Sequence, residues 1–590
     1  MKKRVADIIA EILTEHAITD VFSVVGGGAM FLNDAFGHHD GLRVMYNHHE
    51  QASAVAAEGY VRATGNMAAV CVTTGPGGTN ALTGVMGAYV DNYPMIVISG
   101  QVRYETSIPN TGLTLRTCGE QEFSIVDAAK TMTKYAKMVI DPMEIRYELE
   151  KAIHIANTGR RGPCWIDVPL NVQGAIVEEN DMKSYVPEEK NSKWNPLLFI
   201  NTLNAAKRPV LLIGSAFRSA NAIDKLLKFV KKLRIPVLAA TYNADLLSWD
   251  NEFYFGNFGV NGGRAGNFIV QNADLIIGMG CRMTYRHIGF NYEAFAPTAK
   301  KMIVDVDENE LKKPTLKIDI PINEDIHTVM DALLSSSYEG YNDTVQWLSY
   351  CSRLKNKFPI YIDKFNTSEQ VNPYFFIKKL HEIQAKDNVI VLGNSSIAGH
   401  VLQMGIDIQG QRIINNMNSG SMGYDLPATI GAARALGREV TMITGDGSLQ
   451  MNLQELETIV HYNLPIKMFV CNNGGYRAIV RTQKNFFEGR YTGCSPETGV
   501  GMPDMEKIAY AYGIPFMRIS SHREVESVLK DFYALDGFAM CEVMQDYEQM
   551  IEPRIMSKKL ADGTLVSPVL DDLFPFLSEE DVKDSQYIEK

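Results

Sequence analysis

The sequence predicts an α/β protein with three doubly wound parallel-sheet domains. Its 590 residues are too many for one hydrophobic core and fit about three domains. Short apolar runs alternate with helical patterns and often end at glycine, which is typical of parallel strands covered by helices on both faces. We therefore expect domains at residues 1–180, 195–334 and 372–550. A polar tail at 551–590 follows, and we expect it to close over a ligand pocket.

The composition favours an enzyme that acts on small molecules. Apolar residues make up 46% of the chain and charged residues 21%, which is ordinary for a soluble globular enzyme. The net charge of −12 opposes binding to nucleic acid or to an anionic membrane. The 8 cysteines are scattered without a CxxC pair, so we expect buried thiols in a reducing, cytoplasmic setting. The longest stretch without charge, 66–90, is rich in Gly, Thr and Pro and does not predict a membrane span.

The first domain opens with an amphipathic helix and continues with strands at 21–25, 42–46, 67–74 and 95–99. One apolar face of the opening helix is formed by Val5, Ile8, Ile9, Ile12 and Leu13. The strand at 21–25 runs into a glycine turn that contains Gly28, and the strand at 42–46 leads to a helix that begins near Glu50. An acidic residue is common at the positive end of a helix, so Glu50 could be purely structural.

Three short motifs of the first domain recur in the same order in the third. The motifs RATG (62–65), TGPG (74–77) and NYP (92–94) reappear as RALG (434–437), TGDG (444–447) and NLP (463–465). This order predicts two copies of one α/β unit, although two generic α/β segments could match by coincidence. The second copy has Asp446 where the first has Pro76, so only the second has a metal-binding side chain in this turn.

The stretch 440–473 combines a strand, a glycine turn, a helical pattern at 452–461 and a second strand that ends at two asparagines. Parallel strands joined by a helix end at the same edge of a sheet, so Asp446 and Asn473 should meet there. The backbone N–H groups of the turn Gly445–Ser448, which includes Gly447, suit phosphate oxygens. Mg²⁺ takes one or two protein oxygens together with phosphate and water. The stretch thus predicts a clamp for magnesium and a diphosphate, although an ordinary turn remains the simpler alternative.

The GDG and NN motifs at this spacing resemble those of the thiamine-diphosphate enzymes, and the branch with the strongest resemblance is the acetolactate synthase large (catalytic) subunit. The resemblance implies thiamine diphosphate and Mg²⁺ as cofactors. It implies that Asp446 and Asn473 bind the metal through side-chain oxygens and Gly475 through its backbone carbonyl. It also assigns Tyr476 and the glycine turn to cofactor binding.

Two motifs of the first domain carry the resemblance further. The stretch His48-His49-Glu50-Gln51-Ala52 matches the position of the family's activating glutamate. Glu50 would then hydrogen-bond a pyrimidine nitrogen of the cofactor and favour the tautomer that removes the thiazolium proton, in a pocket shielded from water. The loop 75–80 matches the family's pyrimidine loop and includes Pro76 and Asn80.

Further site residues follow from the same resemblance. In the acetolactate synthase branch a Gln-Glu pair lies near the active site, matched by Gln121, although a solvated helix start fits almost as well. The stretch 419–428 resembles a Met-Gly-x-x-Leu-Pro-Ala motif in which Met422, beside Gly420, props the cofactor in a bent form. Asp425 stands where the branch usually has a small residue, and we expect it to face the acceptor pocket.

The third domain departs from the branch at the end of its first strand. Asn394, Ser395 and Ser396 could donate hydrogen bonds to a diphosphate, but such clusters are also ordinary turns. Acetolactate synthases usually have a Gln/His-rich segment at this position. The departure therefore points to a side branch.

The central domain has glycine and arginine at predicted strand ends, where open α/β sheets bind ligands. These residues are Gly214, Gly280, Arg282 and Arg286. The acetolactate synthase branch binds FAD with a similar Gly-x-Arg-x-x-x-Arg segment. Related enzymes keep the domain without flavin, so the presence of FAD stays open.

The resemblance implies a carboligase that decarboxylates a 2-oxo acid, with pyruvate as the first candidate, and transfers the hydroxyethyl carbanion to an acceptor carbonyl. The acceptor is either a second 2-oxo acid or the keto group of a nucleotide sugar. A simple 2-oxo acid decarboxylase is a further alternative, and a non-catalytic cofactor-binding paralogue is a rival of another class. In the family, the first domain of one subunit pairs with the third domain of another, which implies a homodimer or homotetramer.

Overall fold

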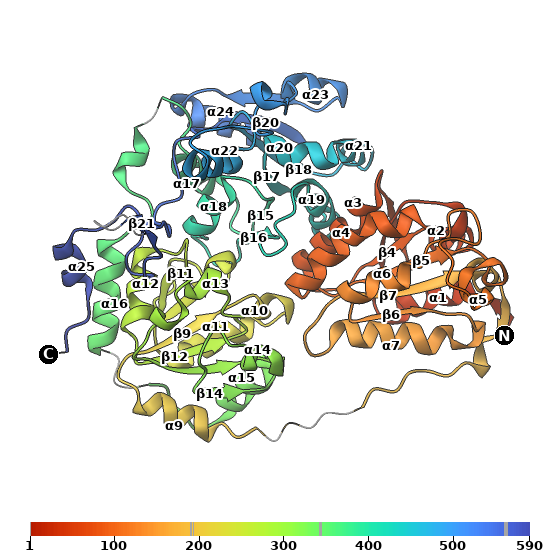
Figure 1. Ribbon diagram of the computed structural model, residues 1–590, viewed down its shortest axis with the longest axis horizontal. Coiled ribbons are helices and arrows are strands. Elements are labelled where there is room, and N and C mark those ends of the chain that lie inside the picture. Colours follow the sequence, from red (N-terminus) through yellow and green to blue (C-terminus); the bar gives the residue numbers. More distant parts are fainter. Residues whose placement is uncertain are drawn as a thin grey trace.

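Three six-stranded parallel sheets form the architecture, one in each part of the chain (Figure 1). The computed structural model describes residues 2–188, 192, 194–341, 345–367, 369–559 and 565–589. Helices cover both faces of each sheet, and separate apolar clusters fill the two sides. The predicted α/β class with three doubly wound sheets is confirmed.

The first sheet has the strand order β3-β2-β4-β5-β7-β6. Its strands are β2 (Asp20–Ser23), β3 (Arg43–Tyr46), β4 (Ala69–Val72), β5 (Ile96–Gln101), β6 (Tyr135–Met138) and β7 (Cys164–Pro169). One face is covered by α1 (Val5–Glu15), α2 (Met30–His38) and α7 (Ile145–Asn157), and the other by α3 (Glu50–Thr64), α4 (Pro76–Asp91) and α6 (Ile125–Ala129). The five apolar residues expected on one face of the opening helix are all buried, as predicted.

The third sheet repeats this topology, with the strand order β16-β15-β17-β18-β20-β19. Its strands are β15 (Val389–Leu392), β16 (Arg412–Asn415), β17 (Val440–Gly445), β18 (Ile466–Asn472), β19 (Phe516–Ile519) and β20 (Ala539–Met544). In each sheet the second strand along the chain lies at one edge, next to the first, and the fifth strand lies at the other edge, next to the sixth. The predicted duplication is confirmed.

The helices of the third domain also divide between two faces. One face is covered by α17 (Pro373–Ile383), α18 (Ala398–Met404) and α24 (Val525–Tyr533), and the other by α19 (Asp425–Leu436), α21 (Leu456–His461) and α23 (Met505–Ala511). The helix expected at 452–461 is shorter than predicted, because a 3-10 stretch occupies Gln450–Glu455. Asn452 leaves the helical region there, and its amide donates to the Gly423 carbonyl at 2.7 Å.

The central sheet has a different order, β11-β10-β9-β12-β13-β14. Its strands are β9 (Pro209–Ile213), β10 (Val237–Ala240), β11 (Tyr254–Phe258), β12 (Leu275–Met279), β13 (Lys300–Val304) and β14 (Ile320–Ile322). Its faces are covered by α9 (Leu197–Ala205), α11 (Ile223–Leu233) and α15 (Ile326–Ser335), and by α12 (Arg264–Asn272) and α16 (Val345–Lys357). The order reverses between β9 and β12, which creates the crevice where doubly wound sheets bind ligands.

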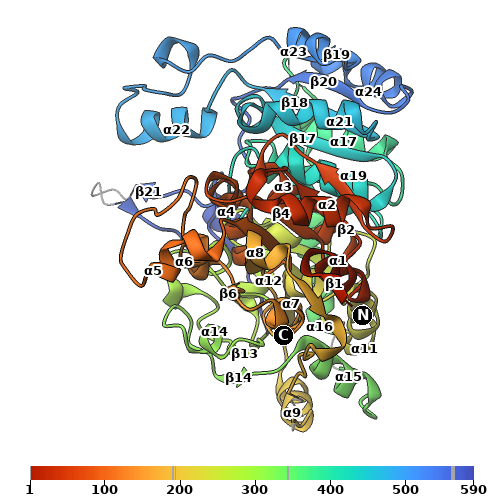
Figure 2. The same cartoon turned by 90° about the vertical axis from the view of Figure 1, so that its right-hand side faces the viewer.

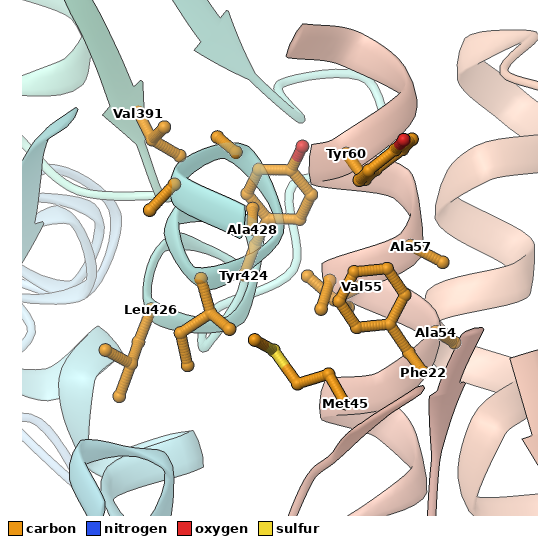
Figure 3. Packing of buried hydrophobic residues seen from close by; sticks show 14 of the residues in the cluster. Phe22, Met45, Ala54, Val55, Ala57, Tyr60, Val391, Tyr424, Leu426 and Ala428 are labelled. Atoms are coloured by element: carbon orange, nitrogen blue, oxygen red, sulfur yellow. The ribbon is translucent and has the colours of Figure 1, made fainter. Parts of the chain in front are cut away.

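The first and third domains share one apolar core where α3 crosses α19. A Cβ atom on Gly59 would lie 2.2 Å from the carbonyl oxygen of Ala428, and one on Gly431 would lie 1.8 Å from that of Ala56. Figure 3 shows Ala428 on the side of α19 that faces Val55 of α3, with Leu426 on the opposite side of the helix. The two backbones approach so closely that only glycine fits at these two positions.

The end of the chain returns to the central domain, as Figures 1 and 2 show. Helix α25 (Glu579–Ser585) lies against α16, where the Tyr350 hydroxyl donates to the Ser585 carbonyl at 2.8 Å. Leu577 packs into the central core, and Arg264 donates to the Leu573 carbonyl at 3.1 Å. The expectation that the tail closes over a pocket is therefore wrong for the described residues 565–589, because their apolar side chains find partners on the central domain.

Candidate functional site

The strands β17 and β18 end side by side and bring the loops after them together. Gly445 pairs with Cys471 in the sheet, so Asp446 and Asn473 leave the same edge. Asp446 Oδ2 accepts a hydrogen bond from the Gly475 N–H at 3.0 Å, and Oδ1 accepts one from the Gly447 N–H at 2.9 Å. Burial raises the pKa of Asp446, and these N–H groups oppose that shift. The carboxylate is thus held at the sheet edge beside the Asn473 loop.

Asn473 has a buried side-chain oxygen without a hydrogen-bond partner. Its Nδ2 donates to Ser396 Oγ at 2.9 Å, while its Oδ1 meets no protein donor. An unpaired buried acceptor costs about 1–3 kcal/mol, so this oxygen suits a cation or a ligand group. In the described part of the chain no group of three or more His, Cys, Asp or Glu gathers as a metal site. One carboxylate beside one amide oxygen fits Mg²⁺ that takes its remaining ligands from phosphate and water.

Glycines keep the floor of this cluster open. A Cβ atom on Gly447 would lie 2.3 Å from the Tyr476 ring, which packs directly on the turn. Gly475 has φ +125°, and a Cβ atom there would lie 2.4 Å from the Cys494 carbonyl oxygen. Ser448 Oγ accepts a hydrogen bond from the Gly423 N–H at 2.9 Å and so connects the turn to the loop that carries Met422.

The segment after β15 joins the same cluster. Asn394 Nδ2 donates to the Gly420 carbonyl at 2.6 Å, and Ser396 Oγ accepts from Asn473. Ser395 Oγ is buried without a partner, and a Cβ atom on Gly445 would lie 3.2 Å from the Ser395 Cβ. Met422 is half-buried in the loop between Gly420 and α19. The diphosphate-side residues predicted from the sequence therefore gather at one sheet edge.

Asp425 does not face a pocket, so the expectation for this residue is wrong. It is fully buried as the first residue of α19, and its carboxylate accepts a hydrogen bond from the Thr444 hydroxyl. A Cβ atom on Gly393 would lie 2.1 Å from Asp425 Oδ2. Burial raises the pKa of Asp425, and the hydroxyls of Thr444 and Ser448 oppose that shift. The start of α19 lies against the end of β17, which turns this side chain inward.

A second cluster forms at the carboxyl edge of the first sheet. Glu50 is the first residue of α3, and its Oε2 accepts a hydrogen bond from Asn80 Nδ2 at 2.9 Å. The Oε1 atom lies 3.5 Å from where a Cβ atom on Gly77 would be. Pro76 begins α4 and is exposed. Glu50 is half-buried within this single chain.

Gly28 and Gln121 both contact the turn at Thr74 and Gly75, which follows β4. A Cβ atom on Gly28 would lie 1.8 Å from Thr74 Oγ1, so the glycine turn packs directly on β4's end. Gly75 has φ +60°, and a Cβ atom there would lie 2.2 Å from the Gln121 carbonyl oxygen. The Gln121 side chain is exposed, and its backbone has φ +62°. Gln121 therefore reaches this cluster through its backbone.

Within one chain the described hydrogen bonds of the two clusters stay within their own domains. Asn80 is in the first turns of α4, whereas Asp91 at the other end accepts a hydrogen bond from Asn418 Nδ2 at 2.6 Å. The helical rise between Asn80 and Asp91 is about 16 Å. Among the described residues no hydrogen bond joins Glu50 or Asn80 to Asp446 or Asn473.

The sequence did not predict the hydrogen bonds that join the first and third domains near Glu50. Glu455 Oε2 accepts a hydrogen bond from Asn47 Nδ2, and Oε1 accepts one from the His48 N–H, both at 3.0 Å. Both partners precede Glu50 on the chain. No local pattern marks Glu455, because its partners belong to another domain.

The glycine and arginine residues predicted for the central domain divide between a crevice and its surroundings. Gly280 and Arg282 line two adjoining cavities, and Gly214 lines one of them. A Cβ atom on Gly214 would lie 2.3 Å from the Gly280 carbonyl oxygen, and Arg282 Nη2 donates to the Val90 carbonyl at 2.5 Å. Arg286 does not line either cavity and lies over the Tyr285 ring at 5.1 Å.

Comparison with known proteins agrees with this arrangement. Three models of thiamine pyrophosphate enzymes match, the N-terminal TPP binding domain at residues 3–122, the central domain at 199–333 and the C-terminal TPP binding domain at 393–543. The acetolactate synthase isozyme 3 large subunit of Escherichia coli (strain K12) is 30% identical over 89% of this chain and 91% of its own length. The large subunit of Corynebacterium glutamicum is 31% identical over 88% and 83%, and that of Haemophilus influenzae 27% over 90% and 92%.

A separate property concerns membranes. None of the helices in the described residues combines the length and the apolar character needed to cross a bilayer.

Proposed function

Because this chain belongs to the thiamine pyrophosphate enzyme family, we propose that it is a carboligase of the acetolactate synthase type. It would decarboxylate a 2-oxo acid, with pyruvate as the first candidate, and transfer the remaining two-carbon unit to an acceptor carbonyl. The observation that carries the proposal is the unpartnered Asn473 Oδ1 beside the Asp446 carboxylate. When bound, thiamine diphosphate supplies the nucleophilic carbon and the electron sink.

The diphosphate-side cluster would hold the metal and the phosphates. We assign the Mg²⁺ ligands to Asp446, Asn473 and the backbone carbonyl of Gly475. Three further parts of the third domain would surround the phosphates. These are the glycine turn (Gly445, Gly447 and Ser448), the segment after β15 (Asn394, Ser395 and Ser396) and the loops that contain Gly420 and Tyr476. Met422 would support the bend of the cofactor.

The first-domain cluster, which contains Glu50 and Asn80, would control proton transfer at the cofactor ring. Glu50 would share a proton with a ring nitrogen of the cofactor, and Asn80 orients that carboxyl through its hydrogen bond. Pro76, Gly28 and Gln121 would shape the wall around the ring. A glutamate in this role needs a pocket shielded from water, and a neighbouring subunit would complete it.

We propose at least a homodimer, with a homotetramer as the larger alternative. Within one chain the described hydrogen bonds of Glu50 stay in the first domain and those of Asp446 in the third, which supports a cofactor shared between two copies. A two-fold symmetric pair would place the first domain of one copy against the third domain of the other.

The central crevice is the candidate site for FAD or another adenine nucleotide. Gly214, Gly280 and Arg282 lie at strand ends next to the reversal of strand order, which supports a nucleotide there. Arg286 fits this assignment less well because it lies outside the crevice. The visible absorption spectrum of the purified protein tests for flavin directly.

The acceptor is a second 2-oxo acid or the keto group of a nucleotide sugar. A simple decarboxylase would release the aldehyde, and a non-catalytic paralogue would bind the cofactor without turnover. Mass spectrometry of the products formed from pyruvate with keto acids and keto sugars separates these alternatives. All 8 cysteines are unpaired, which supports a cytoplasmic location.

Co-expression of Glu50→Gln with Asp446→Ala tests the shared site. Each homodimer should be inactive, whereas a hybrid carries one intact site, so a random mixture should regain roughly a quarter of the wild-type CO₂ release from pyruvate. Failure of the mixture to regain activity, with hybrids verified by tags, would contradict the pairing of the two half-sites. Absence of CO₂ release by the wild type with several 2-oxo acids, despite bound cofactor, would favour the paralogue.

A further inference from the structure

The loop between β16 and α19 contacts two different domains. This loop, residues 416–424, contains Gly420 and Met422, which the proposed function places at the cofactor, and we call it the Met422 loop. Its later part is fixed to the third domain, where the Gly420 carbonyl accepts a hydrogen bond from Asn394 Nδ2 at 2.6 Å. Its middle part, at Asn418, instead contacts the first domain of the same chain.

Asn418 forms a hydrogen bond to the end of α4. Asn418 Nδ2 donates to Asp91 Oδ1 at 2.6 Å, and Asp91 is the last residue of α4. The next residue of the loop, Ser419, lies against the same helix, since a Cβ atom on Gly87 would lie 3.7 Å from Ser419 Oγ. The middle of the Met422 loop therefore packs on α4.

Asp91 is fixed in place by a buried ion pair with Arg62. Arg62 Nη2 donates to Asp91 Oδ2, so each carboxylate oxygen of Asp91 has a partner. Asp91 is 4% exposed and Arg62 is 9% exposed. The Arg62 guanidinium also lies 4.0 Å from the centroid of the Tyr93 ring. A buried carboxylate that is paired in this way has little freedom to move, so it offers the loop an acceptor at a fixed position.

Glu58 completes this buried cluster one helical turn before Arg62 on α3. Glu58 Oε1 accepts a hydrogen bond from Arg62 Nε at 2.8 Å, while Oε2 is buried and has no hydrogen-bond partner in the described part of the chain. Burial raises the pKa of Glu58 to about 7, and the charge of Arg62 opposes that shift. Below that pH Asp91 is the counter-ion of Arg62, and the hydrogen bond from Asn418 is charge-assisted.

We propose that Asp91 is a positioning residue that holds the Met422 loop through Asn418. This inference rests on the proposed carboligase function, in which that loop supports the cofactor bound by the third domain of the same chain. Glu50 lies near the other end of α4, about 16 Å away along the helix axis, and serves the cofactor of the partner copy. Each first domain then acts on two cofactors, one through each end of α4.

Hydrogen–deuterium exchange of the full-length protein tests the contact without any measurement of activity. Asn418→Asp places a second carboxylate against Asp91, so the peptide that covers residues 416–424 should exchange at least about tenfold faster than in the wild type. Asn418→Ala only removes the hydrogen bond and should give a smaller increase. Peptides from β17 and β18 should exchange as in the wild type. Asn485→Asp, at an exposed asparagine of α22 (Arg477–Phe486), is the matched control.

Calorimetric titration with thiamine diphosphate in the presence of Mg²⁺ measures the consequence for the cofactor. Asn418→Asp should weaken the affinity at least about fivefold relative to the wild type, because binding must then order the Met422 loop. Asn418→Ala should weaken it by less, and Asn485→Asp should bind as the wild type does.

The outcomes separate positioning from general stability. Wild-type exchange of the Met422 loop in Asn418→Asp would overturn the proposal, and so would equal increases in Asn418→Asp and Asn418→Ala, which would mean that no carboxylate opposes the new one. Faster exchange throughout the third domain would show a general loss of stability and would also overturn it. So would faster exchange of the loop with unchanged cofactor affinity. A wild type that binds the cofactor but releases no CO₂ from any 2-oxo acid would instead count against the carboligase function.

Discussion

The first and third domains have the same strand order but differ in one turn. In each domain the third strand of the unit leads into a glycine, Gly75 or Gly445, and then into a helix. The first residue of that helix is Pro76 in one copy and Asp446 in the other. A proline restricts the chain and offers no ligand, whereas the aspartate offers a carboxylate at the sheet edge. The scaffold is thus common to both copies, and the side chains at the strand ends divide the chemistry between them.

Replacement of Asp446 by Asn should have the largest effect. Asparagine keeps the shape but removes the only carboxylate of the candidate metal site, so we expect at least about a thousandfold loss of CO₂ release and loss of Mg²⁺-dependent cofactor binding. Calorimetric titration with thiamine diphosphate, with and without Mg²⁺, measures both. Asp531→Asn, an exposed carboxylate of the same domain, is the control. Normal Mg²⁺-dependent binding by Asp446→Asn would refute the assigned difference between the copies.

Replacement of Glu50 by Gln tests the other copy. The amide cannot share a proton with the cofactor ring, so turnover should fall about 10²–10⁴-fold while cofactor affinity stays within a few-fold of the wild type. Steady-state kinetics and titration with thiamine diphosphate measure the two effects. Glu105→Gln, an exposed residue of the first domain, should behave as the wild type. If Glu50→Gln loses affinity and turnover together, Glu50 has a structural role.

Replacement of Gly431 by Ala should weaken the junction of the two copies. The new Cβ atom would lie 1.8 Å from the Ala56 carbonyl oxygen, so α3 and α19 must move apart. We expect a destabilisation of about 1–3 kcal/mol, seen as a lower melting temperature. Gly501→Ala, where nothing lies within 4 Å of the added atom, is the control. Equal melting temperatures for the two variants would mean that the junction tolerates separation.

The smallest effect concerns pH and is confined to the first copy. Burial raises the pKa of Asp167 to about 7, and hydrogen bonds from Ser99 and Gln101 oppose the shift. The unfolded value is about 3.9, so the folded protein binds more protons in between, and stability falls as pH rises through that window. Asp167→Asn should remove this slope and gain melting temperature relative to the wild type between pH 5 and pH 8, on the order of a few degrees.

The control for this measurement is Asp40→Asn, an exposed carboxyl of the same domain. It should track the wild type at every pH. A constant difference between Asp167→Asn and the wild type across the range would show that Asp167 is not the titrating group.

The sequence predicted the features that depend on short-range pattern. The apolar runs, their glycine ends and the repeated turns predicted the three sheets and the duplication, because strand burial and tight turns leave local signals. The approach of Asp446 to Asn473 followed from the parallel crossover rule alone. Both kinds of inference need only residues that are near in sequence or joined by one strand–helix–strand unit.

Features that depend on packing between distant segments could not be predicted. Asp425 was expected in a pocket, but the contact of α19 with the end of β17 buries it. The tail was expected to close over the site, but the apolar residues of its described part 565–589 pack on the central core. The local sequence pattern does not indicate which distant segment will pack against a given residue.

The backbone contact between α3 and α19 has a consequence for motion. At Gly59 and Gly431 no side chain separates the backbones of α3 and α19, so we expect the first and third domains of one chain to move as a rigid body. We therefore expect any opening of the site for substrates to come from segments outside this contact.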